Sequence, residues 1–199
     1  MEKLVVATKN QGKLREVKAL LADYPLEVLS LKDFPDLPEI EETGSTFAEN
    51  ALIKATTVAK QTGLLTLGDD SGLEVDCLDG RPGVLSARFA GEPASDWRNN
   101  QKLLALMAGI APEKRTARFR CVVAIVEPTG QSYLAEGTCE GQIGYAMVGD
   151  QGFGYDPLFI IPGSGLTLAQ LNMASKNKIS HRSQALKQAI PILLSILKR

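Results

Sequence analysis

The sequence predicts a mixed α/β fold built on one central sheet. Short apolar runs alternate with segments of helical period in the first half of the chain. In the second half, the hairpin signal Glu127-Pro128-Thr129-Gly130 joins two β-rich segments. A chain of 199 residues with 44% hydrophobic residues can bury a core of its own. We therefore expect a single domain over residues 1–199, with helices packed on a mixed sheet.

The first elements alternate between strand and helix. The apolar run Lys3–Thr8 predicts a buried strand, and a helical period follows Gly12. The apolar residues of this helix fall on one face, and Glu16 belongs to the opposite, charged face. Glu27–Leu31 predicts a second strand, and the proline-containing stretch Lys32–Ile40 predicts a loop.

The next helix has signals at both of its ends. Thr46-Phe47-Ala48-Glu49 has the spacing of a capping box, and Gly63 is a typical stop signal. Two strands are expected after it, at Leu64–Leu67 and Leu73–Leu78, with Gly68–Gly72 as the loop between them. The remaining elements are, in order, a helix begun by Ser95 or Asp96 and running through Met107, strands over Thr116–Glu127 and Gln131–Ile143, a glycine-rich loop over Gly149–Pro157, a short strand over Leu158–Ile161, and a helical end over about Asn177–Leu197 that Pro191 bends or divides.

Composition and charge exclude several classes of protein. The 22 Lys and Arg residues nearly balance 23 Asp and Glu residues, and nucleic-acid-binding proteins normally have a basic excess instead. No apolar run approaches the roughly 20 residues of a membrane-spanning helix, and the opening residues do not form a signal peptide. The three cysteines have no zinc-site spacing with the only histidine. We therefore expect a cytoplasmic protein with free thiols and with no nucleic-acid or membrane partner.

The first candidate site lies where the first strand meets the first helix, at Thr8-Lys9-Asn10-Gln11-Gly12-Lys13. Such a junction directs free backbone N–H groups and the positive end of the helix dipole at one point, which suits a phosphate. Thr8 and Asn10 add neutral hydrogen-bond donors, and Lys13 adds a cation. An asparagine-capped helix after a strand has the same appearance, and the P-loop pattern is absent.

Two acidic segments are the second and third candidates, Glu41-Glu42-Thr43-Gly44 and Asp69-Asp70-Ser71-Gly72. Each alone is also typical of a solvated loop or a turn. Together, beside a phosphate-binding loop, they are what a Mg²⁺–nucleotide site requires. Magnesium is usually held by one or two carboxylates plus substrate phosphates, and a remaining carboxylate can accept a proton from the attacking water.

The fourth candidate combines Gly152-Phe153-Gly154-Tyr155-Asp156-Pro157 with Lys176 and with Ser180-His181-Arg182 downstream. Two aromatic residues between glycines offer a flat surface with close backbone approach, which suits stacking on a base. The same rings can instead fill the edge of a core. Lys176 and Arg182 flank the histidine with charges that bind anions.

These four clusters, in this order, resemble the inosine triphosphate pyrophosphatase family, whose members are also called dITP/XTP pyrophosphatases. The matching strings run from residue 8 to residue 182 and so cover nearly the whole chain. They are Thr8-x-Asn10-x-x-Lys13, Glu41-Glu42-Thr43-Gly44-x-Thr46-Phe47-x-Glu49-Asn50-Ala51, Asp69-Asp70-Ser71-Gly72-Leu73, Pro82-Gly83-x-x-Ser86-Ala87-Arg88, Gly152-Phe153-Gly154-Tyr155-Asp156-Pro157 and Ser180-His181-Arg182.

The resemblance implies a homodimeric, cytoplasmic, Mg²⁺-dependent enzyme. Such an enzyme would hydrolyse ITP, dITP and XTP to the monophosphate and pyrophosphate, and so remove deaminated purines from the nucleotide pool. The implied fold is a long mixed sheet flanked by helices, with two lobes and the active cleft between them.

The resemblance also implies roles for individual residues. Asp70 would bind the metal and accept the proton, with Asp69 and Lys13 as supporting catalytic residues. Glu41 or Glu42 would be the second metal ligand. The implied substrate-binding residues are Thr8, Lys9, Asn10, Gln11, Gly12, Lys13, Ser71, Phe153, Gly154, Tyr155, Asp156, Lys176, His181 and Arg182.

Two other functions stay open at the level of sequence. A pyrophosphatase of the related septum-inhibitor (Maf) class would prefer modified pyrimidines, so a substrate panel separates it from the first hypothesis. A nucleotide sensor would bind ITP without releasing pyrophosphate. Four carboxylates in two segments are more than a simple phosphate binder needs.

Overall fold

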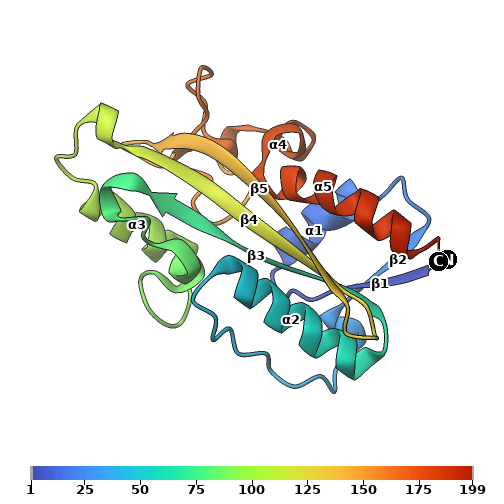
Figure 1. The fold of residues 1–199 in the computed structure, drawn as a ribbon. Helices are drawn as coiled ribbons and strands as arrows, with labels where there is room; N and C mark the ends of the chain where they lie inside the picture. The colour runs from blue at the N-terminus through green and yellow to red at the C-terminus, as the bar shows by residue number, and fades with distance from the viewer. Residues whose placement is uncertain (1, 199) are drawn as a thin grey trace. The chain divides into compact units, whose positions relative to one another are not determined.

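The computed structural model describes residues 2–198 and has a mixed α/β architecture (Figure 1). Its strands form one six-stranded sheet in the order β2-β1-β3-β4-β5-β6. β1 pairs in parallel with β2 and β3, whereas β5 and β6 are antiparallel, which confirms the predicted mixed sheet. The elements are β1 (Glu2–Val6), α1 (Gln11–Leu20), β2 (Leu26–Ser30), α2 (Phe47–Thr62), β3 (Leu65–Val75), α3 (Asp96–Leu106), β4 (Thr116–Val126), β5 (Ser132–Ile143), β6 (Phe159–Ile160), α4 (Met173–Ile179) and α5 (His181–Ile196).

The chain divides into two compact units. The first unit runs to Asp70 and also holds Cys121–Gly137 and the residues from His181 onward. The second unit holds Ser71–Arg120 and Thr138–Ser180. Strands β3, β4 and β5 contribute residues to both units. The expectations of one domain over residues 1–199 and of an active cleft between two lobes stay predictions.

In the first unit, β1 lies between β2 and β3, and helices cover both faces of these strands. Leu4 is in register with Val28 of β2 and with Leu65 of β3. Alternate residues of β1 point to opposite faces: Leu4 packs in a core with α1 and α5, whereas Val5 packs with α2. Figure 1 shows α1 and α5 on one side of these strands and α2 on the other. The two faces of β3 in this unit therefore meet different helices.

Local sequence signals set the ends of α2 as expected. The hydroxyl of Thr46 accepts a hydrogen bond from the backbone N–H of Glu49, and Gly63 ends the helix with a φ of 66°. Gly68 of β3 then allows close packing, because a Cβ there would lie 2.6 Å from the carbonyl oxygen of Ala51. This approach brings the face of α2 against the middle of β3.

The second unit has its own core between α3 and the sheet. Leu73 and Phe119 from the strands pack with Leu103 of α3 and with Met107, which directly follows that helix. The rings of Phe119 and Phe159 lie with their centroids 4.7 Å apart. Each unit therefore buries apolar residues independently of the other.

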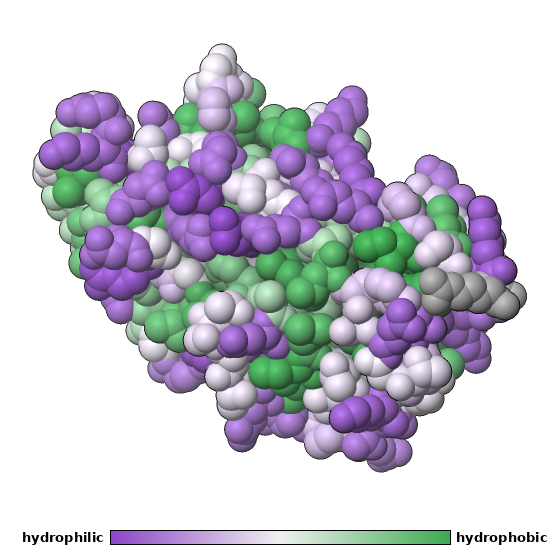
Figure 2. Space-filling model, in the orientation of Figure 1, coloured by the Kyte–Doolittle hydropathy of each residue, from purple (hydrophilic) through white to green (hydrophobic). Residues whose placement is uncertain are grey.

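The surface mixes polar and apolar residues. Figure 2 shows hydrophobic residues in several patches between hydrophilic ones on the face that it draws. The most exposed large apolar side chains are Tyr145 and Trp97, at 65% and 64% of their full accessible area. Single exposed apolar side chains are normal in folded proteins. No helix among residues 2–198 is both long and apolar enough to cross a membrane.

The prediction of a loop over Gly68–Gly72 is wrong, because these residues lie inside β3. Two short strands were expected, and the structure instead has one strand of 11 residues. Gly, Asp and Ser are poor strand formers, so the local preference indicated a turn. Pairing with both neighbouring strands and buried partners for the two carboxylates outweigh that preference.

The prediction for the C-terminal helix is wrong in where it begins and divides. α4 begins at Met173, capped by the side chain of Asn172, and it ends at Ser180 rather than near Pro191. Ser180 has extended backbone with a ψ of 152°, which separates α4 from α5. Pro191 lies inside α5, where packing of the helix on the sheet outweighs the lost backbone hydrogen bond.

Candidate active site

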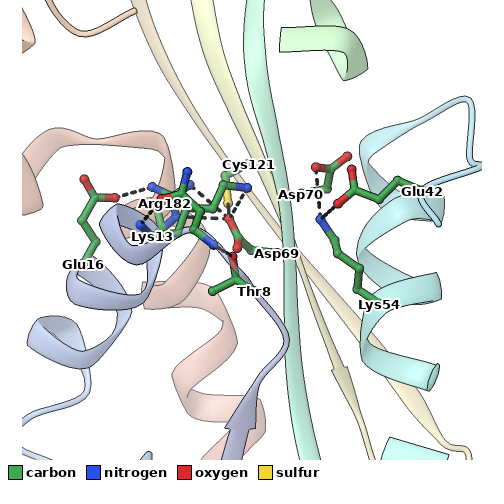
Figure 3. Close-up of polar contacts among 10 residues, drawn as sticks. Thr8, Lys13, Glu16, Glu42, Lys54, Asp69, Asp70, Cys121 and Arg182 are labelled. Atoms are coloured by element: carbon green, nitrogen blue, oxygen red, sulfur yellow. Dashed lines mark hydrogen bonds and ion pairs between the residues drawn. The ribbon is translucent and has the colours of Figure 1, made fainter. Parts of the chain in front are cut away.

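Asp69 and Asp70 are neighbours in β3, so their side chains leave the strand on opposite faces. Figure 3 shows Asp69 among residues of α1 and α5, and Asp70 facing residues of α2 and of the segment before it. Both side chains are buried, at 1% and 5% exposure. The predicted acidic pair is therefore two separate sites within the first unit.

The Asp69 carboxylate lies between two cations. Its Oδ2 atom is 3.2 Å from Nζ of Lys13, and it accepts hydrogen bonds of 3.2 and 3.1 Å from Nε and Nη2 of Arg182. Arg182 also donates to the carboxylate of Glu16, and the thiol of Cys121 lies 3.9 Å from Asp69 Oδ2. We call these five residues the Asp69 cluster.

The cations of the Asp69 cluster keep Asp69 ionised. Burial alone would raise the pKa of Asp69, but Lys13, Arg182 and Lys54 outweigh burial and hold that pKa well below its usual range. The pKa of the Cys121 thiol rises to about 12, through burial first and the Asp69 charge second. Asp69 is thus a permanent anion, and Cys121 stays protonated.

Asp70 has a different set of neighbours. Nζ of Lys54 lies 3.3 Å from Asp70 Oδ1 and 2.8 Å from Oε1 of Glu42, so one ammonium bridges two carboxylates. Burial raises the pKa of Asp70, since Lys54 and Lys13 only partly oppose it. Within the described part of the chain, neither Asp70 Oδ2 nor Asp69 Oδ1 has a hydrogen-bond partner. Asp70 differs from Asp69 in its raised pKa and in sharing its cation with a second carboxylate.

The acidic segment before α2 is held against that helix. The backbone N–H of Gly44 donates to the side chain of Asn50 at 2.8 Å, and Ser45 donates to Glu49. Glu42 therefore faces Lys54, whereas Glu41 is exposed. The sequence did not decide which of these two glutamates would be the metal ligand, and the position of Glu42 beside Lys54 favours Glu42.

The residues near Asp70 fit a magnesium ion. No group of three or more His, Cys, Asp or Glu side chains that could hold a metal occurs within residues 2–198. Magnesium does not need such a cage, because it retains several waters and is held by one or two carboxylates plus phosphate oxygens. Glu42 and Asp70 supply two carboxylates of that kind.

The segment Thr8–Lys13 forms the predicted junction between β1 and α1. Asn10 caps α1 by accepting a 3.0 Å hydrogen bond from the backbone N–H of Lys13, and Thr8 accepts one from the N–H of Asn10. Lys9 is exposed and pairs with Glu39. The first N–H groups of α1, from Gln11 and Gly12, have no partner within the helix and stay available to an anion.

In the second unit, Asp156 organises the aromatic segment. Its Oδ2 atom accepts from the backbone N–H of Phe153 at 3.0 Å and from Nζ of Lys176 at 2.6 Å. That Nζ lies 4.8 Å from the centroid of the Phe153 ring. Tyr155 is buried and donates its hydroxyl to the carbonyl of Ser86, so its ring belongs to the core. Phe153 is the better placed of the two rings for stacking.

The structure divides the fourth predicted cluster between the units. Lys176 and the aromatic segment belong to the second unit, whereas His181 and Arg182 begin α5 in the first. His181 is buried, and α5 packs so close to β5 that a Cβ on Gly137 would lie 2.2 Å from the His181 carbonyl. Ser71 directly follows Asp70 in β3 and is partly exposed. Whether these residues contact substrate stays a prediction.

Sequence reasoning missed two buried ionic residues, and it placed one of them wrongly. Glu16, expected on the charged outer face of α1, is only 4% exposed because it pairs with Arg182. Lys54 was overlooked altogether, although it lies four residues after Asn50 on the buried face of α2. Polar residues at helical spacing within an apolar stripe were the available signal.

Comparisons with known proteins show the family of this chain. The sequence model of the Ham1 family matches residues 4–192. The chain is 56% identical to a dITP/XTP pyrophosphatase of Desulforamulus reducens, over 96% of this chain and 95% of that protein. It is 54% identical to one of Geobacter sulfurreducens, over 94% of each. A solved Ham1 protein structure from Coxiella burnetii superposes with a TM-score of 0.88 at 43% identity, covering 98% of this chain and all of that one. The predicted family resemblance is confirmed, and the chain belongs to the Ham1 family.

Proposed function

We propose that this chain hydrolyses ITP, dITP and XTP to the monophosphate and pyrophosphate with Mg²⁺. Its family and its many relatives with the name dITP/XTP pyrophosphatase make it a nucleoside triphosphate pyrophosphatase. The observation that carries the chemistry is the pair of carboxylates Asp70 and Glu42, which share the single ammonium of Lys54.

In this proposal Glu42 and Asp70 hold the metal, and Asp70 accepts a proton. A bound Mg²⁺ would supply positive charge to the phosphate oxygens. The water oxygen bonds to the α-phosphorus, the bond from that phosphorus to the bridging oxygen breaks, and pyrophosphate leaves. The proton that the water loses passes to Asp70, whose raised pKa makes it a better acceptor than an ordinary aspartate.

The triphosphate would lie against the segment Thr8–Lys13. The N-terminal N–H groups of α1 and the ammonium of Lys13 provide hydrogen bonds and positive charge there. Asp69 supports this role by orienting Lys13 from the buried side. Because the low pKa of Asp69 keeps it charged, it anchors cations and does not exchange protons.

The base would stack on Phe153, with Lys176 as a hydrogen-bond donor beside the ring. Hypoxanthine and xanthine carry an oxygen at C6, which accepts a hydrogen bond from a protein donor, whereas adenine presents an amino group there. A site that leaves polar groups unpaired with the wrong base discriminates strongly. The contacts of Ser71, His181 and Arg182 with substrate, the homodimer and the cytoplasmic location belong to the same proposal.

The test is pyrophosphate release from a panel of triphosphates, with Mg²⁺ and with EDTA. We expect release from ITP, dITP and XTP at much higher kcat/KM than from ATP or GTP, and only with Mg²⁺. Preference for a modified pyrimidine triphosphate would favour the septum-inhibitor class instead. Binding of ITP without release of pyrophosphate would favour a nucleotide sensor. Full activity in EDTA would contradict the proposed requirement for Mg²⁺.

A further inference from the structure

Two side chains of helix α3 form hydrogen bonds with Gly154, in the segment Gly152–Asp156. The carboxylate of Asp96 accepts a 2.7 Å hydrogen bond from the backbone N–H of Gly154. The amide of Asn100 donates a 2.8 Å hydrogen bond to the carbonyl of the same glycine. Both backbone polar groups of Gly154 are therefore held by side chains of one helix within the second unit.

The two side chains are positioned by regular features of α3. Ser95 caps the helix by accepting from the N–H of Arg98, which places Asp96 in the first turn. Asn100 is one turn further along on the same side, since residues four apart share a helix face. Its amide nitrogen also donates to the carbonyl of Asp96 at 2.8 Å, so both of its hydrogens are used. The orientation of this amide is thereby fixed.

The hydrogen bonds to Gly154 also restrict the position of its neighbour Phe153. The N–H of Phe153 is bonded to Asp156, and Asp156 also holds Lys176 beside the Phe153 ring. Gly154 has a φ of 61° with open space where a Cβ would be, so no packing against a side chain of its own fixes its conformation. The hydrogen bonds from α3 supply that constraint.

A purely structural role does not account well for this arrangement. Asp96 is exposed, and the Gly154 N–H that it binds could otherwise bond to water at little loss. Asn100 is buried, yet its Oδ1 atom has no partner among the described residues. An unsatisfied buried oxygen is unfavourable, so the favourable contribution of this amide comes from its nitrogen. That nitrogen donates to the carbonyls of Gly154 and Asp96, and only the Gly154 bond reaches outside α3.

We propose that Asp96 and Asn100 are positioning residues that set the affinity for the nucleoside part of the substrate. They act through Gly154 on the placement of Phe153 and Lys176. This inference rests on the proposed function, in which those two residues hold the base. It separates the affinity for the base, set by Phe153 and Lys176, from the affinity for the phosphates, set by Thr8–Lys13.

The test compares two competitive inhibitors, IMP and inorganic tripolyphosphate, on Asp96→Ala and Asn100→Ala. We expect each variant to weaken IMP inhibition and to raise KM for ITP by about tenfold, as loss of one such hydrogen bond allows. Tripolyphosphate inhibition should stay within about twofold of wild type, and kcat should change less than KM. Gln101→Ala, at an exposed position on the same helix, is the matched control.

Two conservative variants separate positioning from folding. Asp96→Asn keeps an acceptor oxygen and should recover most of the IMP affinity, whereas Asn100→Asp places an anion against a carbonyl and should not. Equal weakening of both inhibitors, or unchanged IMP inhibition in both alanine variants, would overturn the inference. If wild-type protein neither binds IMP nor hydrolyses ITP, the proposed function fails and the inference fails with it. If wild type does both, only the positioning role is in question.

Discussion

On the two faces of β3 in the first unit, the pKa values of the neighbouring residues Asp69 and Asp70 move in opposite directions. Asp69 meets Lys13 and Arg182, and its pKa is held low despite complete burial. Asp70 shares the single cation Lys54 with Glu42, and burial raises its pKa. Figure 3 shows the two sets of contacts on either side of the strand. Residue type alone therefore does not determine the direction in which the pKa of a buried carboxylate moves.

The difference shows that one strand can carry two carboxylates in different environments: Asp69, which anchors two cations, and Asp70, which shares one cation with Glu42. A carboxylate with two buried cations is fixed in charge and position. A carboxylate with a raised pKa, whose cation is shared with a second carboxylate, can bind a metal or accept a proton. The pleat of the strand puts these environments on opposite faces, only one residue apart.

Loss of the anchor should have the largest effect on stability. Asp69→Asn leaves Lys13 and Arg182 buried with less negative charge, and breaking such a buried pair destabilises by about 3–5 kcal/mol. The measurement is urea unfolding at neutral pH. A loss below about 1 kcal/mol would mean that Asp69 is not the charge that holds these cations.

Removal of the shared cation should have a smaller effect, and one that depends on metal. Lys54→Met leaves Glu42 and Asp70 facing each other, and we expect a loss of about 1–3 kcal/mol in EDTA. Mg²⁺ should restore part of that loss, because it supplies the missing positive charge. Unfolding in EDTA and in Mg²⁺ gives the comparison. Lys60→Met, at an exposed position of the same helix, is the control. An equal loss in both buffers would argue against a metal at this face.

On the Asp69 face, Lys13 pairs with Asp69 and, in the proposed function, binds the triphosphate. Lys13→Ala should lower kcat/KM by about tenfold or more, with a fall in kcat, because charge moves onto the leaving pyrophosphate in the transition state. Steady-state kinetics with ITP measures both constants, and the exposed Lys18→Ala on the same helix is the control. A rise in KM with unchanged kcat would mean uniform binding instead.

The smallest expected effect is a difference in pH dependence. A folded pKa below the usual 3.8 means that Asp69 stabilises the fold above that pH and loses this contribution as pH falls through the lowered value. Asp70, with a raised pKa, has the opposite sign and opposes folding as pH rises above 3.8. Between about pH 5 and 3, the stability of Asp69→Asn should therefore fall less steeply than that of wild type. Across this range, the free energy of unfolding of the control Asp36→Asn, at an exposed position, should follow that of wild type. Parallel curves for Asp69→Asn and wild type would contradict the assigned pKa direction.

Sequence reasoning succeeded where the determining contacts are local. The ends of α2 follow from Thr46 and Gly63, which act within one turn of the helix. The continuity of β3 was missed because it depends on pairing with strands far along the chain. Burial of Glu16 was missed for the same reason, since its partner Arg182 lies 166 residues away.

The candidate site shows the same division. The four motifs predicted which segments form the candidate site, because carboxylates suit a metal and a strand-to-helix junction suits a phosphate. The motifs could not give the opposite directions of Asp69 and Asp70, which follow from the strand pleat and not from the loop that was expected. The choice of Glu42 over Glu41 likewise needs the position of Lys54.

The most direct test of this account is the turnover of ITP by Asp70→Asn at saturating substrate and Mg²⁺, measured with its free energy of unfolding. We predict that kcat falls at least about 100-fold, as for loss of a general base, while stability equals or exceeds that of wild type. Asp36→Asn should match wild type in both measurements. Turnover of Asp70→Asn within a few-fold of wild type, with the fold intact, would contradict the assignment of chemistry to this face of β3.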